Sequence, residues 1–154
     1  MNIVLGIICL VVSTYIGYYF SKKYIEKKKF YNDFYFFNKS LYNQISFSQK
    51  SLYNVINDKN NDSYFINSLR RKIIDKDYNY NLSSSFTKDD KDLFIEYSSN
   101  LGSSDYSTQK KFLTDIEAII LNKKNESEIN EKKYKNTYVK LGFTIGLIIL
   151  IILL

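Results

Sequence analysis

The sequence predicts an all-α protein in which a helical bundle domain lies between two transmembrane helices. The chain has 154 residues, no proline and only five glycines, so long helices can run without a break. Residues 1–20 and residues 141–154 carry no charged side chain. Between these apolar ends, apolar residues recur at steps of three and four, which is the spacing of one helix face.

The two uncharged ends set the expected domain boundaries. Residues 1–20 have the length that a bilayer core requires and are predicted to form transmembrane helix 1. A retained span is favoured over a cleaved signal peptide, because the segment has no basic start and no small-residue cleavage site. Residues 21–140 are predicted to form a cytoplasmic helical domain with long connecting helices. Residues 141–154 would form a short transmembrane helix 2 of about 21 Å, and a shallow or tilted insertion is the alternative.

The basic charge lies beside both apolar ends. Of a net charge of +6, residues 21–29 contribute five lysines and one glutamate, and residues 123–140 contribute six lysines and three glutamates. Such flanks place the domain in the cytoplasm and both termini on the other side of a cell membrane. A nucleic-acid surface would put this charge on the domain itself. The membrane-flanking basic residues are Lys22, Lys23, Lys27, Lys28, Lys29 and Lys140.

The composition argues against an enzyme. There is no histidine, and Cys9 is the only cysteine, which excludes metal sites built on His or Cys, disulfides, and Ser-His or Cys-His nucleophiles. The densest carboxylate group consists of Asp89, Asp90 and Asp92. These residues lie at a predicted helix start, where their negative charges interact favourably with the helix dipole. We therefore expect no catalytic residue, no metal and no cofactor.

Helix starts and apolar stripes define the expected domain. Asp62 or Ser63 can cap one helix, and Thr87 with Asp90 reads as a capping box for another. The polar run Asn57–Asn61 is expected to be a turn, and Asp77–Phe86 is a polar connector without a predicted structure. Arg70 and Arg71 suit either a solvated helix face or an acidic partner. The expected core residues are Phe30, Phe34, Phe37, Leu41 and Ile45, then Leu52, Val55 and Ile56, then Phe65, Ile66, Leu69 and Ile73, and finally Leu93, Phe94, Tyr97 and Leu101.

A last long helix is expected to begin at residues 103–105 and to run into the terminal apolar segment. Leu113, Ile116 and Ile120 continue a core stripe, which Phe112 and Ile119 would widen. Between residues 122 and 133 only Ile129 is apolar. This part is therefore expected to project beyond the domain as an unsupported helix, with the favourable pairs Glu128–Lys132 and Glu131–Lys135.

Two motifs are candidate sites. Gly102, Ser104, Asp105 and Gln109 fit a helix–turn–helix corner, with a glycine after one helix and a cap for the next, and they equally fit a contact point for a partner subunit. Ser13 and Gly17 form one small-residue pair at a spacing of four, and Gly142 and Gly146 form another. Such pairs allow close transmembrane helix packing, although Ser13 and Gly17 also suit lipid-facing positions.

The residues at this corner carry a resemblance. Leu101-Gly102-Ser103-Ser104-Asp105, followed by Gln109 and by Leu141-Gly142 and Gly146 in the terminal apolar run, resembles the stage III sporulation protein AB family of endospore-forming bacteria. The resemblance extends over the whole chain. The chain departs from the expected family pattern at Gln44, Ser51 and Asn54, where two acidic positions and a proline are lost, which puts any role of those positions in doubt.

The resemblance implies a non-enzymatic scaffold or coupling subunit of a secretion-like channel complex required for endospore development. It would lie on the mother-cell side of the forespore envelope. Its soluble part would resemble the helical domains of type II secretion and type IV pilus platform proteins. The implied partners are the cytoplasmic ATPase of the complex, the stage III sporulation protein AA, and other membrane subunits, with a homo-oligomer possible.

Two other classes fit the composition. A general membrane-anchored envelope or division scaffold not tied to sporulation is the alternative. A small pore former of the holin type is disfavoured by the long domain between the spans.

Overall fold

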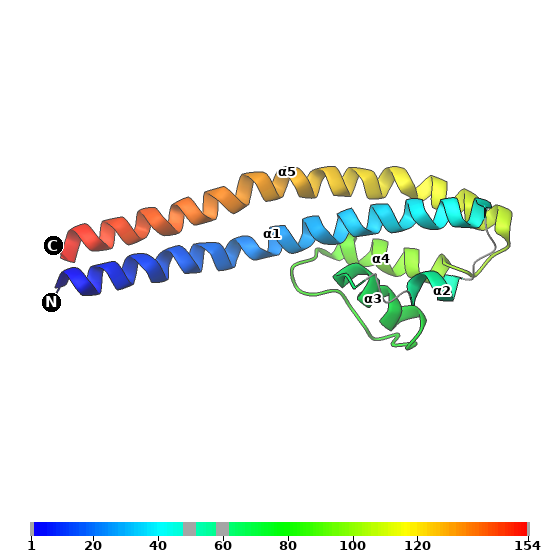
Figure 1. The fold of residues 1–154 in the computed structure, drawn as a ribbon, viewed down its shortest axis with the longest axis horizontal. Coiled ribbons are helices and arrows are strands. Elements are labelled where there is room, and N and C mark those ends of the chain that lie inside the picture. Colours follow the sequence, from blue (N-terminus) through cyan, green and yellow to red (C-terminus); the bar gives the residue numbers. More distant parts are fainter. Residues whose placement is uncertain (1, 48–51, 58–61, 154) are drawn as a thin grey trace. The chain divides into compact units, whose positions relative to one another are not determined.

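The computed structural model describes residues 2–47, 52–57 and 62–153, and its ordered elements in these ranges are all helices. This confirms the predicted all-α class. The helices are α1 (Asn2–Phe47), α2 (Leu52–Ile56), α3 (Tyr64–Ile73), α4 (Lys88–Asn100) and α5 (Tyr106–Leu153) (Figure 1).

The chain forms two compact units. Unit 1 combines the residues up to Lys28 with those from Glu126 onward, and unit 2 comprises Lys29–Asn125. Helices α2, α3 and α4 belong to unit 2 alone, whereas α1 and α5 contribute residues to both units. The two long helices are therefore shared by a two-helix unit and a five-helix unit.

The helix starts follow the capping rules. Ser63 caps α3, because its side chain accepts a hydrogen bond from the Ile66 amide. Thr87 and Asp90 form the predicted capping box of α4, in which each side chain accepts from the other residue's amide. Each cap satisfies amides that have no partner within the helix. Of the expected turn, Asn57 is a turn residue, and the rest of that run lies outside the described residues.

The core of unit 2 is rich in aromatic rings. Phe34 of α1 stacks on Phe65 of α3 with ring centroids 4.6 Å apart, and Tyr97 of α4 meets Phe34 edge-on at 4.5 Å. Such pairs add about 0.5–1.5 kcal/mol beyond the burial of their area. The predicted core residues of α1, α3 and α4 are buried or packed against this cluster, apart from Ile45, whose side chain lies outside the described part. Leu82 and Phe86 of the connector are buried as well.

Two expectations for α5 were wrong. The Ile119 side chain is 50% exposed, because it lies about 120° around the helix from Leu113. Most of residues 122–133 lie outside unit 2, as expected, but they do not form an unsupported helix. Ser127 and Glu131 are 2% and 8% exposed, and Glu131 Oε2 lies 3.4 Å from Lys28 Nζ of α1. Polar pairing between α1 and α5 supports this part of α5, where apolar residues are scarce.

Arg70 serves the fold of unit 2. Its guanidinium donates to the Ile56 carbonyl at 3.2 Å and to Asn67 Oδ1 at 2.8 Å, so it joins the end of α2 to α3. Arg71 is exposed, and the central carbon of its guanidinium lies 5.3 Å from the centre of the Tyr80 ring. Lys72 donates to the carbonyls of Tyr78 and Tyr80. The end of α3 thereby orders the connector that follows it.

In unit 1, α1 and α5 lie side by side and antiparallel (Figure 1). Large apolar side chains are exposed there, with Val11 61% and Ile151 69% exposed. Both helices are long and apolar enough to cross a membrane by length and composition. Apolar residues on the outer face of a helix pair are typical of a surface that lipid covers.

Candidate functional site

The corner between α4 and α5 is closed by two hydrogen-bonded residues. Gly102 follows α4 with a φ of +72°, a conformation that glycine adopts without strain. Its amide donates to Gln109 Oε1 at 2.9 Å, and the Gln109 side chain is buried. Gln109 Nε2 is buried and has no hydrogen-bond partner among the described residues. Gln109 therefore holds the corner from inside.

Asp105 caps α5 from the exposed side of the corner. Its Oδ2 accepts from the Ser107 hydroxyl at 2.5 Å and from the amides of Ser107 and Thr108 at 3.1 and 3.4 Å. These bonds lower the pKa of the Asp105 carboxyl to about 2, and the bond from the Ser107 hydroxyl has the largest effect. Ser104 is exposed beside it. Of the four candidate residues, Ser104 and Asp105 are the ones whose side chains face solvent and are open to a partner.

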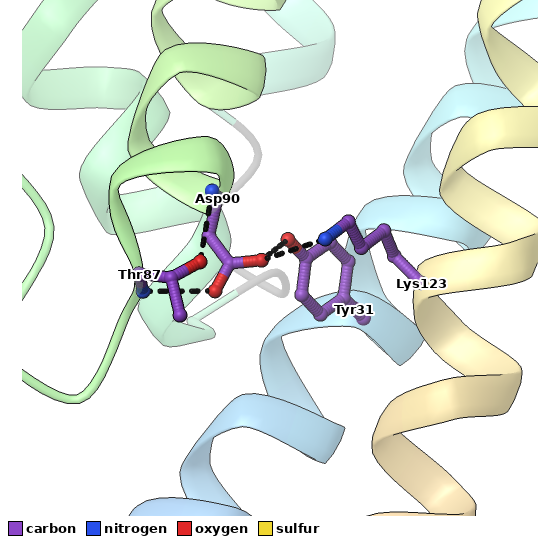
Figure 2. Close-up of polar contacts among 4 residues, drawn as sticks. All are labelled: Tyr31, Thr87, Asp90 and Lys123. Carbon is purple, nitrogen blue, oxygen red and sulfur yellow. Dashed lines mark hydrogen bonds and ion pairs between the residues drawn. The ribbon is translucent and has the colours of Figure 1, made fainter.

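A buried carboxylate joins three helices of unit 2, and sequence reasoning missed this role (Figure 2). Asp90 of α4 is 1% exposed. Its Oδ1 accepts from the Tyr31 hydroxyl of α1 at 2.6 Å and lies 3.5 Å from Lys123 Nζ of α5. Its Oδ2 accepts from the Thr87 amide at 2.9 Å. A capping carboxylate thus also pairs with a cation and a phenol, which offsets the cost of its burial.

A second buried polar pair links the same helices. The Tyr97 hydroxyl of α4 donates to Asn38 Oδ1 at 3.1 Å, and Asn38 Nδ2 donates to the Leu113 carbonyl of α5 at 3.0 Å. Complete burial raises the pKa of the Tyr97 phenol well above its ordinary value. Because both polar groups of the Asn38 side chain are bonded, this residue fixes the register of α1 against α4 and α5.

The sequence carries a signal for both polar pairs. Asp90 stands four and seven residues before Phe94 and Tyr97, so it lies on the apolar stripe of α4. Asn38 lies on the stripe of α1, four residues after Phe34 and three before Leu41. A polar residue at the position of an apolar stripe indicates a buried hydrogen bond.

The two small-residue pairs meet in unit 1. A Cβ atom added to Gly142 would lie 2.5 Å from the Ser13 carbonyl oxygen and 3.2 Å from Gly17 Cα. One added to Gly17 would collide with the Tyr138 carbonyl, and one added to Gly146 would lie 2.7 Å from Leu10 Cα. The backbones of α1 and α5 therefore approach so closely that only glycine fits at these positions, as in tightly packed membrane helices.

The candidate basic residues differ in their surroundings. Lys28 and Lys135 both pair with Glu131 at 3.4 Å. Burial raises the pKa of the Glu131 carboxyl, but the two lysines outweigh that effect and lower it overall. Lys27 is half-buried like Lys28. The exposed members of the set are Lys22, Lys23, Lys29 and Lys140.

The described residues do not bring together three or more His, Cys, Asp or Glu side chains that could hold a metal ion. Asp89 and Asp92 are exposed, whereas Asp90 is buried, so the three carboxylates do not converge. The arrangement is one of helix caps, buried polar ties and close helix contacts, which are features that serve packing and protein contact.

Comparison with known proteins identifies the family of the chain. No curated protein and no solved structure matches the chain significantly. The family described as stage III sporulation protein AB matches residues 2–154, which is nearly the whole chain. The corner of α4 and α5, the close contact of α1 and α5 and the two apolar segments all lie within that match. The chain therefore belongs to the stage III sporulation protein AB family.

Proposed function

We propose that this protein is a non-enzymatic scaffold or coupling subunit of a secretion-like channel complex required for endospore development. Membership of a sporulation family over residues 2–154 is the observation that carries the proposal. Its partners would be the cytoplasmic ATPase of that complex and other membrane subunits. The helical bundle of unit 2 would resemble the helical domains of type II secretion and type IV pilus platform proteins.

The apolar segments of unit 1, residues 1–20 and 141–154, would lie in the membrane. Exposed apolar side chains along α1 and α5 support insertion of both helices, and the close approach at Gly17 and Gly142 supports their packing as a pair. Lysines next to both apolar segments favour a cytoplasmic position for unit 2. In a sporulating cell this corresponds to the mother-cell side of the forespore envelope.

The proposed coupling is mechanical. Because α1 and α5 each contribute residues to both units, a force that a partner applies to unit 2 would reach the membrane helices through continuous helical backbone. The exposed Ser104 and Asp105 at the α4–α5 corner are the proposed partner-contact residues, and Gly102 and Gln109 hold the backbone that presents them.

An inserted hinge tests the coupling. A flexible Gly-Ser segment after Asn125, at the unit boundary within α5, should preserve partner binding and abolish sporulation in a host that lacks its own copy of the gene. The same insertion after the exposed Asn81 of the connector is the control and should preserve both. Normal sporulation with the Asn125 insertion would rule out mechanical coupling.

Cysteine labelling tests the topology. In a Cys9→Ser background, single cysteines after Met1, at Asn57 and after Leu154 would be exposed to a membrane-impermeant reagent in intact cells. Labelling at both ends but not at Asn57 is expected. Labelling at Asn57 would refute the cytoplasmic position of unit 2. Lack of labelling at the C-terminal site alone would indicate that the last segment is a shallow anchor.

A further inference from the structure

Two lysines in unit 1 flank a stack of tyrosine rings. Tyr24 of α1 and Tyr134 of α5 stack with centroids 4.7 Å apart, and Tyr138 lies 6.0 Å from Tyr24. Lys23 Nζ lies 5.0 Å from the centre of the Tyr24 ring, and Lys133 Nζ lies 5.2 Å from that of Tyr134. The stack therefore holds an ammonium group from each helix in place by cation–π contact.

Carboxylates in the described part of the chain do not form ion pairs with these ammonium groups. Among the described residues, no ion pair involves the exposed Lys22, Lys23, Lys132, Lys133 or Lys140. Lys28 and Lys135, by contrast, share Glu131. The positive charge around the tyrosine stack is thus available to an anion from outside the chain.

The position of the stack along the helices indicates which class of anion would fit. Tyr24 follows the uncharged residues 1–20 by one helical turn, and Tyr138 precedes the uncharged residues 141–154 by three positions. Tyrosine rings of membrane proteins gather at the level of the lipid headgroups. Lysines at that level reach the phosphates, and basic sites between membrane helices bind anionic headgroups.

We propose that Lys23 and Lys133, held on the Tyr24–Tyr134 stack, bind the phosphate of an anionic phospholipid headgroup. The proposal rests on insertion of α1 and α5 into a membrane, and it is independent of the coupling role. A bound lipid would bridge the two helices at the surface where they leave the bilayer and would fix their spacing there.

Unit 2 offers a matched control. Lys39 lies 5.8 Å from the Tyr35 ring and Lys110 lies 5.2 Å from the Tyr42 ring, so the same kind of contact recurs away from the apolar segments. Lys39→Gln with Lys110→Gln removes the same charge as Lys23→Gln with Lys133→Gln. Only Lys23→Gln with Lys133→Gln should affect lipid binding.

The test uses the full chain reconstituted in phosphatidylcholine bilayers with trace spin-labelled phosphatidylglycerol or spin-labelled phosphatidylcholine. Electron paramagnetic resonance measures the fraction of each lipid immobilised by the protein. The protein should prefer phosphatidylglycerol, and Lys23→Gln with Lys133→Gln should lower that preference by up to about fivefold per lysine. The control variant Lys39→Gln/Lys110→Gln should keep the preference for phosphatidylglycerol, and rising salt should weaken this preference.

Three results would overturn the inference. One is equal immobilisation of the two lipids by the unchanged protein, and another is a full preference in the Lys23→Gln/Lys133→Gln variant. The third is loss of the preference on adding millimolar glycerol phosphate, which would indicate a site for free anions. Flotation of the vesicles distinguishes absence of the lipid site from failure of membrane insertion. If the protein does not float with the vesicles, membrane insertion is refuted as well.

Discussion

The Tyr31 hydroxyl donates a 2.6 Å hydrogen bond to Oδ1 of Asp90, 59 positions away in the sequence. The bond between Tyr97 and Asn38 spans the same separation of 59. The two bonds lie seven residues apart on both α1 and α4, which is about two helical turns, so these helices run parallel and in register. Lys123 joins the first bond and the Leu113 carbonyl joins the second, which fixes α5 as the antiparallel third helix.

Removal of the Asp90 carboxylate should destabilise unit 2 strongly. Asp90→Ala leaves the Tyr31 hydroxyl and Lys123 without their acceptor and breaks the capping box of α4, with an expected loss of about 3 kcal/mol in the free energy of unfolding. Asp92→Ala is the control, because Asp92 is an exposed acid near the same helix start. Urea unfolding of the full chain in detergent, followed by circular dichroism, would compare them. Equal effects would refute the role of the buried network.

The buried phenol of Tyr97 should make unfolding sensitive to alkali. Because burial raises its pKa in the folded state, the folded protein holds this proton more tightly than the unfolded chain does. Its contribution is complete below the unfolded pKa of about 10 and is lost as the pH rises above that value. Urea midpoints measured from pH 9 to 12 should fall less steeply for Tyr97→Phe than for the unchanged protein. Identical slopes would show that Tyr97 is not protected from ionisation.

The local rules predicted much of the fold. Thr87 and Asp90 at a spacing of three predicted the start of α4, and Gly102 predicted its end, because caps depend on short-range hydrogen bonds. Apolar spacing predicted the buried faces of α1, α3 and α4, because residues three and four positions apart lie on the same face of a helix. The connector at residues 77–86 had no periodicity, and the packing of Leu82 and Phe86 depends on the rest of unit 2.

The pairings between distant residues could not be predicted in the same way. The capping spacing identified Asp90, but nothing in the local sequence identified Tyr31 and Lys123 as its partners, because their proximity depends on the register of three helices. For the corner, the sequence indicated that Gly102 and Gln109 belong together without indicating which one is buried. The packing of residues 122–133 was missed because it uses Lys28 and Glu131 in place of apolar residues.

Asp105 should give the protein an acid-sensitive element at the start of α5. Its pKa of about 2 in the folded protein lies below the value of about 3.9 in an unfolded chain. The stability that it contributes is therefore present above pH 4 and is lost as the pH falls from about 4 to about 2. Asp105→Asn should flatten the decline of the urea midpoint in this interval. Asp115→Asn, at an exposed position within α5, is the control, and an equal flattening in both variants would contradict the assignment to Asp105.

A side chain at Gly102 should strain the corner. Its φ of +72° disfavours β-branched residues, and an added Cβ would lie 3.1 Å from Leu52 Cδ2, so Gly102→Val should lower the free energy of unfolding by about 1–3 kcal/mol. Gly102→Asn should be milder, because asparagine tolerates this conformation. Thermal unfolding and spore counts would be measured for both. A Gly102→Val protein that keeps its melting temperature but fails to support sporulation would assign the corner to partner contact.

A single methyl group at Gly142 should push α1 and α5 apart. The added Cβ of Gly142→Ala would lie 2.5 Å from the Ser13 carbonyl oxygen, where ordinary contact begins at 3.4 Å. Because backbone atoms cannot move aside as a flexible side chain does, the helices must separate by about 1 Å at this level. Gly6→Ala is the matched control, since its Cβ meets the Leu150 side chain, which can change its rotamer. Double electron–electron resonance between labels at the exposed Tyr15 and Phe143 positions, in a Cys9→Ser background, would measure the separation. An unchanged distance in Gly142→Ala, with no difference from Gly6→Ala, would show that the two helices do not pack through this glycine.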